Sequence, residues 1–215
     1  MKLGQAIIMN ALCLIALFSC NNVNKVNSAK EDSDEYSKIL RFFGDSLVNH
    51  FPKEEPTKIN TTQNMDTFCY HNTLSFDLTL YDAKNIIDST LNFYSKQPIV
   101  QYKSNDICLI VVNDYLTIYN SGDPFRAEKS TYFNGCSKDK LPIPNFFFNN
   151  LASSETRCRL PKDYMLYVID SKVGLFSKKI NTEQSSLPNH IRHGYSKGLA
   201  INKEKNIINF WVIVW

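Results

Sequence analysis

Several motifs that would assign a chemistry are missing from this sequence. It has no CxxC pair, which disfavours a zinc ribbon or a thioredoxin-like redox site. It has no phosphate-binding glycine loop, EF-hand loop or Rossmann signature. It has no basic tract, and its formal net charge is only +3, so nucleic acid is not an expected partner. We therefore expect neither a bound metal nor a cofactor.

The apolar run near the start of the chain, residues 6–18, is interrupted only by Asn10. It is shorter than the roughly 20 apolar residues that a membrane-spanning helix needs. Lys2 precedes it, and the small residue Ser19 follows it. A charged start, a short apolar core and a small residue before the cleavage point are typical of a secretory signal peptide.

The leader ends in LFSC, residues 17–20, which resembles the lipobox of bacterial lipoproteins. Together with the abundance of Asn, Lys, Ile, Tyr and Phe, it resembles a lipoprotein of the Bacteroidetes type. The resemblance implies cleavage before Cys20, acylation of its thiol with fatty acids such as palmitate, and anchoring in a membrane. Asn21 stands where an aspartate would mark inner-membrane retention, so the implied location is the outer membrane, on its periplasmic or cell-surface side. An ordinary signal peptide that leaves Cys20 as a free thiol is the alternative.

The composition divides the chain into three parts: a signal peptide at residues 1–19, a tether at 20–34 and a folded domain at 35–215. The tether region has two valines and no aromatic residue, so it cannot bury enough apolar surface to order itself. Removing residues 1–19 removes one lysine, which lowers the formal charge from +3 to +2. The remaining length suits a single globular domain.

The hydrophobic pattern predicts an α+β fold. Apolar residues at helical spacing predict two helices near the N-terminus, one over residues 35–50 with Asp34 as N-cap and one over roughly 83–95 with Asp82 as N-cap. Alternating or fully apolar segments predict strands at 74–80, 107–112, 164–170, 194–202 and 207–215, with a hairpin into 115–119. We expect the two helices to pack on a mostly antiparallel sheet of six or seven strands.

Four cysteines remain besides those of the leader, and four cysteines allow three pairings. An exported protein sits where disulfides form. Cys136 and Cys158 lie in polar, turn-like surroundings, and they are the pair we favour. Cys108 opens an apolar segment, where it fits the role of a small buried hydrophobe.

The stretch HGYSKG, residues 193–198, contains the GxSxG letters of a hydrolase nucleophile elbow around Ser196. An elbow needs a strand before the serine and a helix after it, and the sequence predicts neither. No histidine follows His193, so the chain order of an α/β-hydrolase is also missing. Ser196 and His193 are therefore weak catalytic candidates.

A structural interpretation of the same stretch fits better. One face of the predicted strand 194–202 carries only Gly194, Ser196, Gly198 and Ala200. Glycine inside a strand often marks the close approach of another group. We expect an aromatic ring or the first helix to lie across this face.

Two further groups are candidate binding residues. The first is a basic cluster that could bind an acidic glycan, made up of His190, Arg192, His193 and Lys197. A solvated basic loop is the simpler interpretation of these residues. The two histidines also have the His-x-x-His spacing of some metal sites, but the motif here lacks further ligands. Phe146, Phe147 and Phe148 could be a loop pinned to the core by two rings, or an apolar lip around a binding cleft.

The sequence thus favours a lipid-anchored protein of the cell envelope that binds a glycan, a peptide or an envelope partner, and disfavours an enzyme. A cell-envelope hydrolase with a site assembled from distant residues is the first alternative. A structural or assembly lipoprotein is the second.

Overall fold

The computed structural model describes residues 29–54, 56, 61–67, 73–112, 135–176, 187 and 189–215. Within these ranges the helices are α2 (Ala29–Phe43), α3 (Asp45–Val48) and α4 (Lys84–Tyr94), with short 3-10 turns η1 (Phe146–Phe148) and η2 (Asn189–Ile191). The strands are β1 (Thr61–Thr67), β2 (Leu74–Leu80), β3 (Val100–Lys103), β4 (Met165–Val173), β5 (Gly194–Asn202) and β6 (Ile207–Val214).

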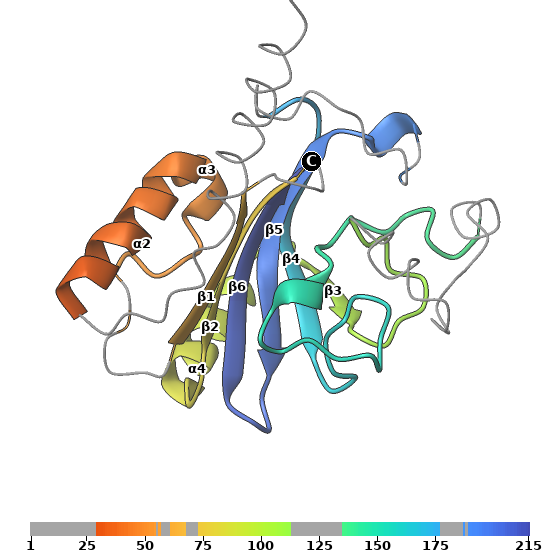
Figure 1. Ribbon diagram of the computed structural model, residues 1–215. Coiled ribbons are helices and arrows are strands. Elements are labelled where there is room, and N and C mark those ends of the chain that lie inside the picture. The colour runs from red at the N-terminus through yellow and green to blue at the C-terminus, as the bar shows by residue number, and fades with distance from the viewer. Residues whose placement is uncertain are drawn as a thin grey trace, which may run out of the picture.

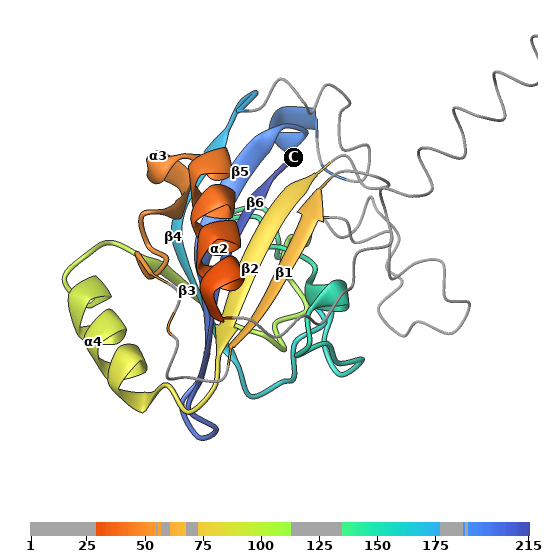
Figure 2. The same cartoon turned by 60° about the vertical axis from the view of Figure 1, so that its left-hand side comes forward.

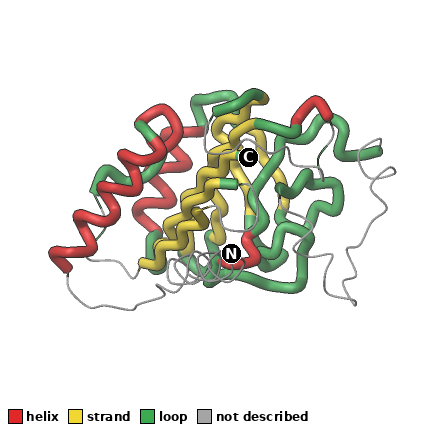
Figure 3. The backbone as a smooth tube through the Cα atoms, turned by 45° about the horizontal axis from the view of Figure 1, so that its top comes forward, coloured by secondary structure: helices red, strands yellow, loops and turns green. Residues whose placement is uncertain are grey.

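All six strands form one antiparallel sheet in the order β1-β2-β6-β5-β4-β3. After β2 the chain passes through α4 to the far edge, where β3 begins. It then returns strand by strand until β6 pairs with β2. Figure 3 shows three layers, with the helices on one side of the sheet and irregular loops on the other. The expected α+β fold, with helices preceding and packing on an antiparallel sheet, is confirmed.

The helix side of the sheet holds the first of two apolar cores. Alternate residues of β2, with Phe76 among them, face α2, which lies across the sheet in Figure 2. The Phe76 ring stacks on Phe51 with a centroid separation of 5.1 Å and lies 6.1 Å from the ring of Tyr36. Helix and sheet therefore stabilise each other through aromatic burial.

The loop side of the sheet holds the second core. Trp211, Ile213 and Trp215 project from the end of the chain into this side, where Ile143 and Leu160 of the loop layer meet them. Because both faces of β6 are covered, its sequence is apolar almost throughout, as in a strand buried on both sides.

The helix boundaries differ from the expected ones. The helix predicted over 35–50 is interrupted at Gly44, whose φ of 81° ends α2 before α3 starts. At its other end α2 begins at Ala29, so residues 29–34, which were expected in the tether, are helical. Asp34 therefore lies inside the helix and is not its N-cap. Asp82 is not the N-cap of α4, because Ala83 occupies that position and makes no side-chain cap hydrogen bond.

The prediction of a strand at residues 107–112 is wrong. Leu109–Val112 are buried, as an apolar run should be, but they lie in the loop layer over the sheet. Their ladder pairing is one isolated bridge between Val111 and Ile143. The predicted strand 115–119 lies outside the described residues. Two edge strands were not predicted, because β1 is a polar segment and β3 is only four residues long.

Candidate functional site

The glycine-flanked stretch around Ser196 is a packing feature of β5. A Cβ on Gly198 would lie 2.5 Å from Cζ2 of Trp211, and one on Gly194 would lie 2.8 Å from Cζ2 of Trp215. The expectation that an aromatic ring lies over the small-residue face is confirmed. Ser196 stands between the two glycines and is completely buried, with no exposed surface from which its hydroxyl could attack a substrate.

The predicted basic cluster is divided between two places. Lys197 is buried on the helix side of β5, where its Nζ donates to the Ser46 carbonyl at 2.7 Å and to Asn49 Oδ1 at 2.8 Å. His190 is exposed in η2, and Arg192 and His193 are half-buried just before β5. Lys197 therefore fixes the end of α3 to the sheet and does not join the other three residues in one anion site.

Beside Lys197 lies His50, which the sequence analysis did not single out. Its Nε2 is 3.0 Å from the Trp211 carbonyl oxygen, and the Phe51 ring packs edge-on against it. Burial, together with the nearby Lys197, lowers the pKa of His50 to about 3. His50 is thus a neutral donor that fastens the segment after α3 to the centre of the sheet. No local sequence signal distinguishes it, since its partner lies 161 positions away.

The end of the β4–β5 pair carries a second polar contact on the helix side. Tyr195 Oη donates to Asp170 Oδ2 at 2.6 Å, and the ring of Phe176 meets that of Tyr195 edge-on at 4.5 Å. Burial, together with this hydrogen bond to a carboxylate, raises the pKa of Tyr195. The phenol therefore stays protonated and works as a fixed donor.

The three adjacent phenylalanines form η1, which we call the aromatic turn (Phe146–Phe148). Phe146 is 3% exposed and meets the Trp211 ring edge-on at 6.5 Å. Phe147 and Phe148 are 37% and 53% exposed, and their rings pack edge-to-face at 5.1 Å. One ring, not two, pins this loop to the core.

Asparagines on either side anchor the aromatic turn. Asn145 Oδ1 accepts from the Phe147 amide at 3.0 Å, which caps the turn. Asn149 is buried and donates from Nδ2 to Asp77 Oδ1 at 2.5 Å, and Asn209 Nδ2 donates to the same oxygen at 3.0 Å. This amide–carboxylate network connects the turn to β2 and β6, and it therefore fixes the position of the backbone that carries Phe147 and Phe148.

The disulfide joins Cys108 to Cys136, so the expected Cys136–Cys158 pair is wrong. Cys158 is a buried thiol whose Sγ lies 3.5 Å from the Ser104 carbonyl, and burial raises its pKa. The small buried hydrophobe is thus Cys158 and not Cys108.

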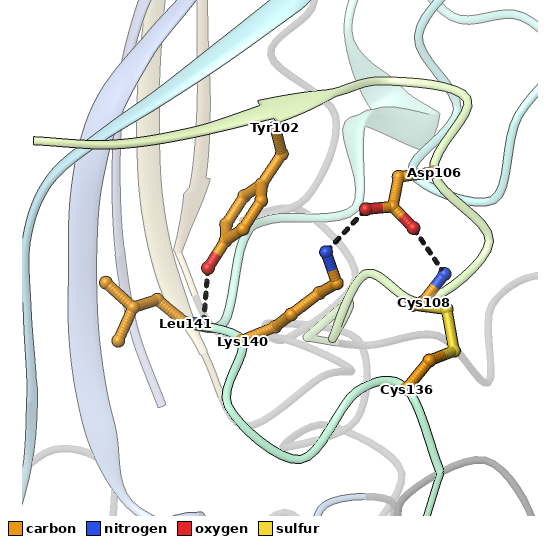
Figure 4. Close-up of polar contacts among 6 residues, drawn as sticks. All are labelled: Tyr102, Asp106, Cys108, Cys136, Lys140 and Leu141. Atoms are coloured by element: carbon orange, nitrogen blue, oxygen red, sulfur yellow. Dashed lines mark hydrogen bonds and ion pairs between the residues drawn. A yellow bond between two sulfur atoms is a disulfide. The ribbon is translucent and has the colours of Figure 1, made fainter.

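Around the disulfide the loop layer is further cross-linked (Figure 4). Lys140 Nζ lies 2.5 Å from Asp106 Oδ2 and 4.6 Å from the centroid of the Tyr102 ring. Asp106 Oδ1 accepts from the Cys108 amide at 2.8 Å, and Tyr102 Oη accepts from the Leu141 amide at 2.8 Å. These contacts hold β3 and the disulfide together and leave no open reactive group among them.

Over the part of the chain that the structure describes, no group of three or more His, Cys, Asp or Glu residues could hold a metal ion. In those same residues no helix has the length and apolar character to cross a bilayer. No protein-family model, curated protein or solved structure matches this chain.

Proposed function

We propose that this chain is an exported, lipid-anchored protein of the cell envelope whose folded domain binds a protein or peptide partner through the aromatic turn. The observation that carries the proposal is the way Phe147 and Phe148 are presented. Phe146 on one side and Asn149 on the other are buried and bonded to the sheet, while the two rings between them are exposed. Exposed aromatic side chains on a fixed base are typical of interaction sites.

The geometry of the pair favours a protein or peptide over a glycan. The planes of the two rings stand at 89° to each other, so they present one edge and one face and no continuous flat surface. Such a wedge fits an apolar pocket between side chains. Lys197 of the basic cluster donates its hydrogen bonds to Ser46 and Asn49 at α3, so it does not face an acidic glycan together with the other three residues. This weakens the glycan alternative.

Two observations support export and anchoring. The LFSC stretch at residues 17–20 supplies a cysteine for acylation. The disulfide between Cys108 and Cys136 fits an oxidising compartment outside the cytosol. The nine residues 20–28, which precede the start of α2 at Ala29, would connect the lipid to the domain.

The hydrolase alternative has little support around Ser196, which is buried between two glycines that each lie beneath a tryptophan ring. A purely structural lipoprotein differs from a binding protein in one respect, namely that its exposed aromatic residues make no specific contact.

Site-specific photo-crosslinking tests the proposal. A photoreactive phenylalanine analogue replaces Phe148 in the full chain expressed in its own cells, and Phe93, an exposed phenylalanine on α4 that is 61% exposed, is the matched control position. We expect a discrete crosslinked partner from position 148 only, and its loss when Phe147→Ala is added. Identical patterns from both positions, or no adduct from position 148, would contradict the proposal.

A further inference from the structure

The end of β4 carries three exposed apolar side chains outside the aromatic turn. We call residues 173–176 the apolar hook. Val173 is 59%, Leu175 64% and Phe176 43% exposed. Three exposed apolar side chains within four consecutive residues form a larger apolar patch than isolated exposed residues do. Such patches are typical of interaction sites.

The hook has a defined conformation. Gly174 adopts a φ of 139°, which ends the regular strand, and its amide donates to the His193 carbonyl at 3.0 Å. The Phe176 ring packs on Tyr195, whose hydroxyl is bonded to Asp170. Val173 pairs with Gly194 at the start of β5. The hook is therefore built on the sheet and presents Val173 and Leu175 outward.

Basic residues flank the hook. Lys172 immediately precedes it and is 64% exposed. His193, whose carbonyl receives the Gly174 amide, belongs to the stretch that also contains His190 and Arg192. Asp170 is the acidic group beside them; it is hydrogen-bonded to Tyr195 and lies 3.9 Å from Lys172.

From this combination we infer that the apolar hook is a membrane-docking site, which inserts Val173 and Leu175 into the interface of a bilayer that contains anionic lipids. Apolar side chains with lysine or arginine beside them suit this interface, where the chains enter the acyl boundary and the cations meet lipid phosphates. The inference rests on the proposed function, because the lipid on Cys20 would keep the hook close to a bilayer.

The reach of the chain is compatible with both attachments. In Figures 1 and 2 the hook lies at the end of the sheet near the chain's last residue, and α2 starts at the opposite end. The fifteen residues of α2 span about 22 Å. The nine residue-to-residue steps from Cys20 to Ala29 can span at most about 30 Å. The lipid and the hook can thus reach the same membrane, although the start of α2 lies at the end of the domain away from that membrane.

Vesicle co-sedimentation of the chain from Asn21 onward tests the hook without the lipid. This chain retains every described helix and strand, since α2 begins at Ala29. The probes are vesicles of neutral phosphatidylcholine and vesicles with added anionic phosphatidylglycerol. We compare Leu175→Ser with Phe93→Ser, which removes an apolar side chain of similar exposure from α4.

We expect stronger partitioning to the anionic vesicles, and a roughly tenfold decrease for Leu175→Ser, as loss of one largely inserted leucine would give. Phe93→Ser should leave the partitioning unchanged, and circular dichroism should show both variants folded. No binding to anionic vesicles, or equal losses for the two variants, would overturn the inference. Because Cys20 is absent from this chain, the outcome is separate from that of the lipid anchor and of the crosslinking at Phe148.

Discussion

The indole ring of Trp211 lies directly over Gly198, the residue with which it pairs across β5 and β6. A Cβ at Gly198 would stand 2.5 Å from Cζ2 of that ring and 2.1 Å from the Tyr167 carbonyl oxygen on the other neighbouring strand. The second glycine of the GxSxG letters is therefore required by packing in the sheet, and the same holds for Gly194 beneath Trp215.

Gly198→Ala should destabilise the protein by about 3 kcal/mol or more, because neither the strand backbone nor the tryptophan ring can move aside cheaply. Gly44→Ala is a comparison without a packing clash. Its Cβ would meet nothing within 4 Å, and its cost of about 1–3 kcal/mol comes from a φ of 81° and a ψ of 151°, which residues other than glycine rarely adopt. Urea unfolding measures both, and a Gly198→Ala chain as stable as the parent would contradict the packing role.

Ser196→Ala should leave the free energy of unfolding within about 1 kcal/mol of the parent value, or raise it slightly. The reason is that, in the described residues, the buried Ser196 hydroxyl has no hydrogen-bond partner. Thermal unfolding and an ester-hydrolysis assay on the parent and the variant check this. An esterase activity of the parent that disappears in Ser196→Ala would restore the catalytic interpretation.

Stability should fall as the pH falls from about 6.5 towards 3, through His50. Its pKa is about 3 in the folded protein and 6.5 in an unfolded chain, so between these values the unfolded state binds a proton that the folded state does not. Between pH 7 and pH 5 this one group contributes a loss of about 2 kcal/mol.

His50→Gln keeps a donor for the Trp211 carbonyl and should remove that part of the pH dependence. His190→Gln, at an exposed position, is the control and should retain it. Urea unfolding of the three chains at pH 7 and pH 5 decides the matter. If the free energy of unfolding falls equally between pH 7 and pH 5 in His50→Gln and in the parent, His50 is not the responsible group.

Loss of the disulfide in Cys136→Ser should reduce stability by about 3 kcal/mol, since the bond joins positions 28 residues apart. Cys158→Ala should cost less, because it removes one buried sulfur and no cross-link. Peptide mapping without reductant should recover Cys108 joined to Cys136. A Cys136–Cys158 peptide would contradict the structure and support the pairing favoured by sequence alone.

The sequence predicted best those elements whose burial follows from a local pattern. The strand 74–80 alternates, and the small face of strand 194–202 indicated a ring above it; both predictions agree with the structure. The segment 107–112 failed because an apolar run reports burial and not hydrogen-bond pairing, and here the loop layer supplies the burial.

The side-chain contacts that organise the sites were beyond prediction for a different reason. Lys197 looked like part of a basic loop because its neighbours in sequence are basic, but strand alternation turns it to the helix side, where Asn49 binds it. The cysteine pairing failed because turn-like surroundings do not determine which loops meet in space. The partners lie 148 positions apart for Lys197 and Asn49, and 28 positions apart for the two cysteines.

Both proposals place the domain at a membrane, and the mature N-terminus tests that claim most directly. The chain is isolated from the membrane fraction of its own cells, and its N-terminal peptide is analysed by mass spectrometry. We predict a peptide that begins at Cys20 and carries fatty acids, and the absence of this acylated peptide in Cys20→Ala. A mature chain that begins elsewhere, or an unmodified thiol at Cys20, would contradict the account.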